Sequence, residues 1–225
     1  MSNKDLSQIA IFFFATLLQP FASAAENVMA GASFENTPAG ETPGQPWKTR
    51  AEGENTNIER KSPPGHASKN WIRILDHDGV QKVYLQLDIP QVTKGELSFK
   101  LYFPTTDGTI GIFLRSSDPT LKNGQIVEFK TLEGSGNIYV GSHGDRSRLP
   151  ITVAGPITFD FDLEFEATDA GELVSLYVND DAGRHLIHQN TVEGGGAVDK
   201  LMIATDTKTS ATEVYIGDIE IKKRP

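Results

Sequence analysis

Residues 157–166 read "ITFDFDLEFE", and from Phe159 onward apolar and acidic side chains strictly alternate. Successive side chains of a β-strand point to opposite faces of the sheet, so a period of two predicts a strand with one buried face. The apolar set is Phe159, Phe161, Leu163 and Phe165, and the opposite set is Asp160, Asp162, Glu164 and Glu166. We therefore interpret this stretch as a strand with an apolar inner face and an acidic outer face.

The same alternation recurs along the chain after residue 70. It is clear in "ELSFKLYF" (96–103), "TIGIFLR" (109–115) and "ELVSLYVND" (172–180). Gly, Asn, Asp or Pro clusters separate these segments at hairpin spacings, and no long segment carries a helical apolar stripe. The chain is thus predicted to be all-β. We expect about a dozen strands. They are predicted to form a two-sheet antiparallel β-sandwich, or jelly roll, in preference to a closed barrel.

The first 24 residues have the features of a secretory signal peptide. Lys4 precedes an apolar run at 9–18, and small residues follow at 22–24. The run is too short to span a bilayer and no second run occurs, so the mature chain is predicted to lack a transmembrane segment. We therefore expect a secreted or periplasmic protein.

The remaining residues, 25–225, are predicted to form a single domain. Up to about residue 70 this domain is rich in Gly, Pro, Asn, Glu and Thr, and only residues 32–35 look like a strand there. The chain has no Cys, so an exported protein of this size has to be stabilised by its apolar core and not by disulfides.

Composition also excludes some functions. The formal net charge is −9 and the one basic run is at 222–224, so binding to nucleic acid is not expected. Neither Cys clusters nor a phosphate-binding glycine loop that opens a helix is present, so no redox or nucleotide cofactor is expected.

Several outward positions of the predicted strands carry aromatic side chains. If their strands are neighbours, these residues would form a mixed polar and aromatic surface, which suits the apolar faces and hydroxyl edges of sugar rings. The predicted ligand contacts are Tyr102, Phe113, Arg115, Tyr139 and Tyr177. The alternative is that edge strands, loops or the N-terminal segment cover them.

Four stretches resemble the concanavalin A-like or laminin-G-like jelly rolls. They are "ASFENTPAGETPGQPW" (32–47), "GELSFKLYFPTTDGTIGIFLR" (95–115), "ITFDFDLEFEATDAGELVSLYVND" (157–180) and "VDKLMIATDTKTSATEVYIGDIEI" (198–221). The resemblance covers nearly the whole mature chain. It depends on the order and spacing of the predicted strands and on two short signatures, "FE" and "Y-I-x-D-I". Lectins, carbohydrate-binding modules, glycan hydrolases and lyases share this fold, so fold alone does not select a function.

The resemblance implies a candidate calcium site. In similar carbohydrate-binding modules a structural calcium ion often joins an acidic residue of the first strand to one of the last, and Glu35 and Asp218 occupy matching places. Calcium takes about six to eight oxygen ligands, which carboxylates and backbone carbonyls of the N-terminal segment could supply. The alternative is that Asp218 caps a hairpin and Glu35 pairs with a lysine.

The resemblance also implies a candidate catalytic strand. The β-glucanases of this broad fold use a Glu-x-Asp-x-Glu strand, which Asp160, Asp162 and Glu164 match with Asp in place of the first Glu. A retaining mechanism needs carboxyl groups about 5–5.5 Å apart, whereas positions i and i+4 of a strand are roughly 13 Å apart at Cα. The shorter Asp160 works against closing that gap, so a solvated or cross-strand-paired face is the preferred interpretation.

Three functions remain open. The favoured one is an exported, non-catalytic carbohydrate-binding, lectin-like module whose partner is a polysaccharide or glycan. The second is a glycan hydrolase or lyase. The hydrolase would use the acidic strand Asp160 to Glu166, and the lyase would use a base such as Tyr139 or His143 beside Arg148. The third is a structural or protein-binding surface domain.

Overall fold

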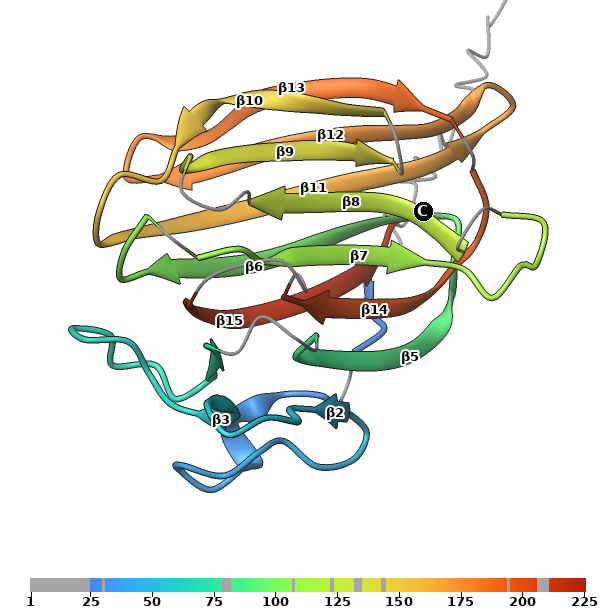
Figure 1. Ribbon diagram of the computed structural model, residues 1–225. Coiled ribbons are helices and arrows are strands. Elements are labelled where there is room, and N and C mark those ends of the chain that lie inside the picture. Colours follow the sequence, from blue (N-terminus) through green and yellow to red (C-terminus); the bar gives the residue numbers. More distant parts are fainter. Residues whose placement is uncertain are drawn as a thin grey trace, which may run out of the picture.

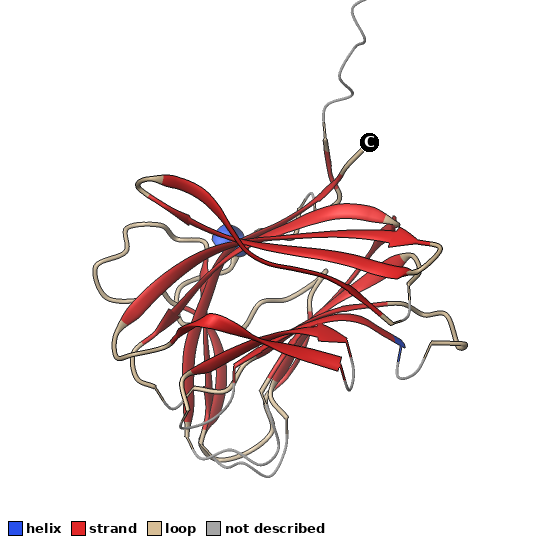
Figure 2. Ribbon diagram, turned by 90° about the horizontal axis from the view of Figure 1, so that it is seen from above, coloured by secondary structure: helices blue, strands red, loops and turns tan. Residues whose placement is uncertain are grey.

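The computed structural model describes residues 25–29, 31–77, 82–106, 108–121, 124–131, 135–142, 145–193, 195–205 and 211–225. Within them the chain forms a sandwich of two antiparallel sheets, which Figure 1 shows face-on and Figure 2 shows as two layers. This arrangement confirms the predicted all-β sandwich. The proposed signal peptide, residues 1–24, lies outside the described residues.

One sheet, here called sheet A, has the strand order β13-β12-β11-β6-β15-β4-β3, and β1 also pairs with β15. Its strands are β1 Glu26–Asn27, β3 Thr56–Arg60, β4 Trp71–Asp76, β6 Lys94–Phe103, β11 Ile157–Thr168, β12 Gly171–Asp180, β13 Gly183–Val192 and β15 Thr212–Lys223. The other, sheet B, has the order β10-β9-β8-β7-β14-β5-β2. Its strands are β2 Lys48–Arg50, β5 Tyr84–Val92, β7 Gly111–Arg115, β8 Gln125–Thr131, β9 Asn137–Ser142, β10 Asp145–Thr152 and β14 Val198–Ala204.

The core lies between the two sheets, where the alternation predicted it. In β6 the four apolar residues at alternate positions are at most 1% exposed: Leu97, Phe99, Leu101 and Phe103. The ring of Phe99 packs against Phe161 of β11 and Phe129 of β8, with centroids 5.4 and 5.3 Å apart. Phe159 and Val178, also expected inside, are partly buried and pack against the rim of this core.

The N-terminal segment closes one edge of the sandwich (Figure 1). β3 extends sheet A beside β4, and β2 extends sheet B beside β5. The expected strand at 32–35 was wrong, because Phe34–Asn36 is a 3-10 turn. Polar side chains explain the turn: Ser33 Oγ accepts from the N–H of Glu35, and Asn70 Oδ1 accepts from the N–H of Phe34 at 2.9 Å. These donors are therefore satisfied without a neighbouring strand.

Candidate functional site

The candidate site lies on the outer face of sheet B, where three strands place large side chains side by side. Phe113 of β7 is directly opposite Met202 of β14 on one side and Glu128 of β8 on the other. Two residues further along β7, Arg115 is opposite Lys200 of β14. Because residues two apart on a strand share a face, this register gathers an aromatic ring, a thioether and charged groups on one surface.

This surface is hollowed into a depression of about 350 Å³. It is lined by Lys82, Phe113, Arg115, Gln125, Glu128, Lys130, Arg146 and Met202. Gly111 lets the ring of Phe113 lie close to the strand, since a Cβ atom there would lie 2.5 Å from the ring. The ring therefore lies over the bare backbone of Gly111, and its apolar surface faces the depression.

The polar wall of the depression is organised around Glu128. This side chain is only 2% exposed, and its Oε2 accepts hydrogen bonds from Arg146 Nε at 2.5 Å and Gln125 Nε2 at 2.9 Å. Gly141 of β9 is opposite Glu128 of β8 on one side and opposite Arg146 of β10 on the other. It has no side chain to separate the two. A buried carboxylate requires such partners, so the pair fixes the orientation of the Arg146 guanidinium.

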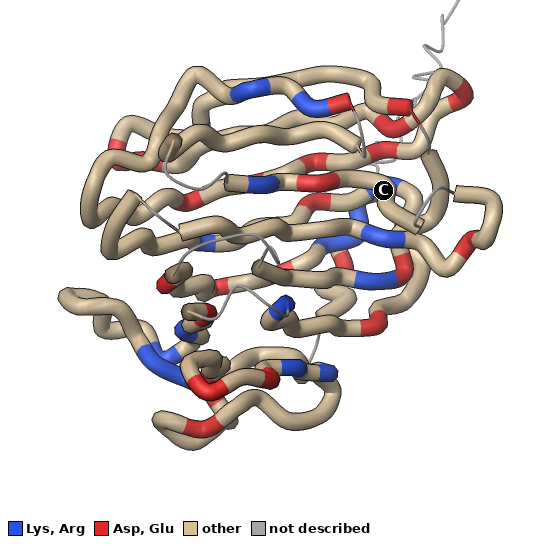
Figure 3. Tube along the Cα trace, viewed as in Figure 1, with Lys and Arg blue, Asp and Glu red and all other residues tan. Residues whose placement is uncertain are grey.

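The depression is basic although the chain is acidic. Among the residues that the structure describes, its lining contains four cationic residues and one carboxylate, whereas the whole chain has a formal net charge of −9. In Figure 3 Lys and Arg positions recur along β7, β8, β10 and β14. Cationic side chains are thus concentrated in this lining, in contrast to the acidic composition of the chain.

The structure brings three of the five predicted ligand residues to this sheet. Phe113 and Arg115 line the depression, and Tyr139 of β9 is opposite Lys130 of β8 and Arg148 of β10. Arg115 Nη1 also contacts Met202 Sδ at 3.4 Å. The other two predicted residues, Tyr102 and Tyr177, are on the outer face of sheet A.

On sheet A the predicted aromatics are contacted by neighbouring side chains. The imidazole of His66, from the loop between β3 and β4, lies 5.8 Å from the ring of Tyr102 and 5.1 Å from Trp71. Arg184 of β13 stacks on the ring of Tyr177 at 3.8 Å. His66 and Arg184 thus pack against these two rings, which are half-buried.

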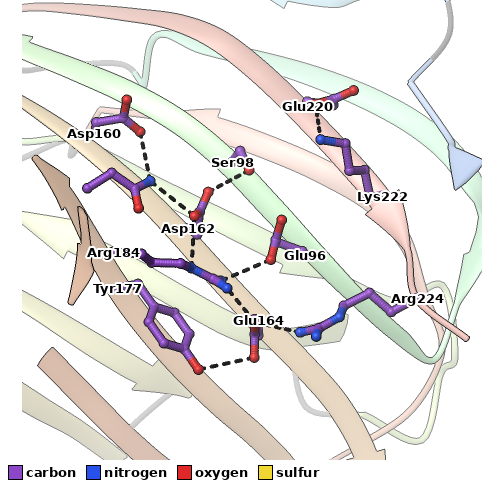
Figure 4. Close-up of polar contacts among 11 residues, drawn as sticks. Glu96, Ser98, Asp160, Asp162, Glu164, Tyr177, Arg184, Glu220, Lys222 and Arg224 are labelled. Carbon is purple, nitrogen blue, oxygen red and sulfur yellow. Dashed lines mark hydrogen bonds and ion pairs between the residues drawn. The ribbon is translucent and has the colours of Figure 1, made fainter. Parts of the chain in front are cut away.

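The carboxylates of β11 are paired across strands on that same face (Figure 4). Arg184 contacts both Asp162, at 3.0 Å, and Glu164, at 2.9 Å. Arg224 also reaches Glu164, at 2.5 Å, and Lys100 lies 3.6 Å from Asp160. The acidic strand is therefore an ion-paired face, which is the interpretation that the sequence favoured.

The two candidate calcium ligands lie near Asn70. Glu35 follows Phe34, whose N–H is bound by the Asn70 side chain, and the N–H of Asp218 donates to the Asn70 carbonyl at 3.1 Å. Asp218 is in a left-handed conformation (φ 49°) at a bulge of β15, and its Oδ2 accepts from Lys100 at 2.9 Å. This hydrogen bond raises the pKa of Lys100. A lysine ammonium thus occupies one oxygen of Asp218, and the described residues contain no group of three or more His, Cys, Asp or Glu suited to a metal.

The site contains residues that the sequence analysis did not single out. They are Lys82, Gln125, Glu128, Lys130, Arg146 and Met202. The alternation in "QIVEFK" (125–130) placed Glu128 and Lys130 on the face opposite Phe129, so this part of the site was detectable. His143, considered for a lyase, lies outside the described residues.

Comparison with known proteins gives structural matches only. No family model and no curated sequence matches the chain. A sialidase superposes on 90% of this chain with a TM-score of 0.62 at 12% identity, and the chain covers 19% of that protein's length. The chain thus corresponds to about a fifth of that sialidase.

Two further matches are similar in length to this chain. A carbohydrate esterase from the Shiga toxin-encoding bacteriophage phi24B matches 80% of this chain and 91% of its own, with a TM-score of 0.56 and 13% identity. A β-glucanase from Bacillus licheniformis matches 83% and 96%, with a TM-score of 0.51 and 10% identity. The chain has a concanavalin A-like jelly-roll fold. At such identities the likeness describes the fold, and function has to be argued from the site.

Among the described residues there is no helix with the length and apolar character needed to cross a membrane.

Proposed function

We propose that this chain is an exported, non-catalytic carbohydrate-binding module that binds a glycan on the outer face of sheet B. The observation that carries the proposal is the depression around Phe113, which combines an apolar floor with a polar wall. Sugar rings have the same combination, because their C–H faces pack on aromatic rings while their hydroxyl groups hydrogen-bond to side chains. The glycan-acting proteins among the structural matches support this proposal.

The two faces of the sandwich differ in a way that favours sheet B. On sheet A the acidic side chains pair with cations, and His66 and Arg184 pack on the predicted aromatics. A ligand there would have to break ion pairs before it gained contacts. On sheet B the Phe113 ring and the Met202 thioether already line an open depression, so binding requires less rearrangement.

Affinity electrophoresis on a panel of immobilised polysaccharides tests the proposal. We expect at least one polymer to retard the protein, and Phe113→Ala to weaken that binding about fivefold to tenfold, because about 1 kcal/mol of aromatic contact is lost. Leu186→Ala is the matched control. It removes an apolar side chain of similar size that is 52% exposed on sheet A, and it should leave the retardation unchanged.

Gly111→Ala probes the same site without removing any contacting group. The new methyl group would lie 2.5 Å from the Phe113 ring, so the ring has to move away from the backbone. We expect weaker glycan binding with the far-ultraviolet circular dichroism unchanged. Failure of all polymers to retard the wild-type protein would contradict the proposal and favour a protein-binding domain.

Catalysis is checked with the same polymers. New reducing ends or unsaturated products would contradict the non-catalytic part of the proposal. Loss of those products in Asp162→Asn would then assign the activity to β11, whereas their loss in Tyr139→Phe would assign it to sheet B.

A further inference from the structure

Met202 places a thioether in the lining of the sheet B depression. The chain has three methionines, of which Met1 lies outside the described residues and Met29 is 6% exposed within the core. In β14, Leu201 and Ile203 are buried between the sheets, so Met202 points to the outer face. It is half-buried there and lines the depression. The two described methionines therefore differ in their access to solvent.

The register places this thioether within the proposed binding surface. Met202 is opposite Phe113 of β7 on one side and opposite Gln86 of β5 on the other. Side chains that are directly opposite on one face of a sheet contact each other, so the thioether borders the apolar floor that Phe113 forms. Arg115 Nη1 donates to its Sδ at 3.4 Å. A chemical change at the sulfur atom therefore alters both the floor and the polar group beside it.

A thioether that solvent reaches is open to oxidation by peroxide. A lone pair of the sulfur attacks one oxygen of hydrogen peroxide, and the S–O bond forms as the O–O bond breaks. The proton of the transferred oxygen moves to the departing hydroxide, which leaves as water. The sulfur loses two electrons to the peroxide, and the product is a polar sulfoxide. A depression of about 350 Å³ admits the oxidant, since a water molecule occupies about 30 Å³ of liquid.

Arg115 provides a donor for the new oxygen. A thioether sulfur is a weak hydrogen-bond acceptor, whereas a sulfoxide is polar and accepts through its oxygen. The N–H of Arg115 that already donates to Sδ reaches this oxygen after a small movement. The oxygen then lies beside Phe113, and a polar pair replaces the apolar border of the ring. The apolar face of a sugar loses contact there, so its affinity falls.

We propose that Met202 is a reversible oxidation site that controls ligand binding in the sheet B depression. The thioether form permits binding, and the sulfoxide form, held by Arg115, weakens it. The oxidant is a peroxide. The control of binding rests on the proposed carbohydrate binding at the same site, whereas the oxidation itself requires no glycan.

Peptide mass spectrometry tests the oxidation on the folded, full-length protein after timed exposure to hydrogen peroxide. We expect the sulfoxide to form about tenfold faster at Met202 than at Met29, because the core shields Met29. In concentrated urea the two rates should become equal. Equal rates in the folded protein would overturn the proposal, and so would a difference that persisted in urea, because the local sequence and not the fold would then set the rate.

Affinity electrophoresis on a polymer that retards the protein tests the control of binding. Peroxide treatment should weaken binding about fivefold, because aromatic contact with the sugar is lost. Methionine sulfoxide reductases that act on both epimers should restore it. Met202→Leu should bind like the wild type and become insensitive to peroxide, because leucine keeps the apolar volume and has no sulfur. Met29→Leu is the matched control and should remain as sensitive as the wild type.

Met202→Gln imitates the oxidised form without peroxide, because it places a polar acceptor on a side chain of similar length. We expect its binding to be about fivefold weaker than that of Met202→Leu. Urea unfolding of each variant confirms that it is folded. Full binding by Met202→Gln would contradict the control.

The outcomes separate this inference from the proposed function. Oxidation of Met202 without loss of retardation would overturn the control while the proposed carbohydrate binding stands. Peroxide-induced loss of retardation in Met202→Leu would do the same. If no polymer retards the untreated wild-type protein, the proposed function fails and the control fails with it. Mass spectrometry then still decides whether Met202 is the oxidation site.

Discussion

At the scale of single residues, Glu172 is the most unusual side chain of the core. It begins the inward-facing row of β12, is fully buried, and lies opposite Ala167 of β11 and Val192 of β13. Neither of its carboxylate oxygens has a hydrogen-bond partner within the part of the chain that the structure describes. Burial raises the pKa of Glu172 to about 8, and the nearby N–H of Gly196 opposes this only in part. The group is therefore protonated in the folded protein at neutral pH.

This carboxyl group makes the stability depend on pH. Its pKa is about 8 in the folded state and 4.5 in the unfolded chain, so the folded state binds more protons between these values. The free energy of unfolding should therefore fall as pH rises from about 4.5 to about 8. Glu172→Gln keeps the shape and removes the ionisation. We expect urea unfolding at pH 8.5 to show the variant more stable by on the order of 3 kcal/mol, with little difference at pH 4.5.

Two alternative results would contradict this account of Glu172. If Glu172→Gln had the same effect at both values of pH, the carboxyl group would not be titrating abnormally. If the variant were less stable at every pH, the carboxyl group would have partners that stabilise its charged form. Ser175→Ala, a neighbouring buried polar change on β12, is the control, because it carries no titratable group.

The sequence predicted which way side chains point better than it predicted what covers them. Alternation placed Phe99 and Phe161 in the core and Phe113, Tyr139 and Tyr177 outside it, because a period of two depends on local geometry alone. Whether an outward ring meets solvent depends on distant segments. Tyr177 is stacked by Arg184 from another strand, and that contact has no local signature.

At the scale of elements, β11 is stabilised at its outer face by side chains from strands on both sides. Arg184 of β13 lies within 3.0 Å of carboxylate oxygens of Glu96, Asp162 and Glu164, which belong to β6 and β11. Asp162 also accepts from Ser98 at 2.6 Å and Asn179 at 3.0 Å. These contacts with the acidic row thus join four neighbouring strands of sheet A. The partner side chains compensate the like-charge repulsion within β11.

Removing the central cation should show how much this network contributes. Arg184→Gln leaves three carboxylates with fewer positive neighbours, but the arginine side chain is 36% exposed and solvent screens the effect. We expect a loss of about 1 kcal/mol in the free energy of unfolding at low salt. Because the effect is electrostatic, the loss should shrink in about 1 M NaCl.

The control for Arg184→Gln is Lys61→Gln. It removes a cation that is 51% exposed and 3.8 Å from Glu59, and it should change the stability by less than about 0.5 kcal/mol. A loss for Arg184→Gln that persisted at high salt would mean that packing on Tyr177, and not charge, is what the arginine provides.

Element boundaries were predictable where alternation was long and unpredictable where it was short. β6 and β11 appear as the pattern indicated. In the N-terminal segment, β2 has three residues and β3 has five, too few to reveal a period. These strands form because β5 and β4 offer unpaired edges, which is a property of the assembled sheets and not of the local sequence.

At the scale of the whole molecule, charge is distributed unequally between the two outer faces. Sheet A carries the acidic row of β11, and sheet B carries the basic depression. The net charge of −9 gave no indication of this, since a sum over the chain contains no information about faces. The strand order explains the difference, because β7, β8 and β10, which carry the lining residues Arg115, Lys130 and Arg146, belong to one sheet.

The N-terminal segment determines whether the molecule behaves as one cooperative unit. Trp47 is 4% exposed, its ring lies 5.1 Å from that of Phe34, and its Nε1 donates to the carbonyl of Ala32 at 2.8 Å. Both rings belong to the continuous core between the sheets. The edge formed by β2 and β3 is therefore held to the sandwich by apolar packing, in a chain without disulfides.

Trp47→Ala tests that cooperativity. Removing the ring leaves a cavity and an unpaired carbonyl at Ala32, so we expect the free energy of unfolding, measured in urea, to fall by about 3 kcal/mol. Trp47→Phe should lower it less, because phenylalanine keeps most of the side-chain volume. If residues 25–225 are one domain, the variant should still unfold in a single transition with an unchanged m-value. A second transition at low urea would instead mean that the N-terminal segment detaches separately while the remaining strands keep their own core. The prediction of a single domain would then be wrong.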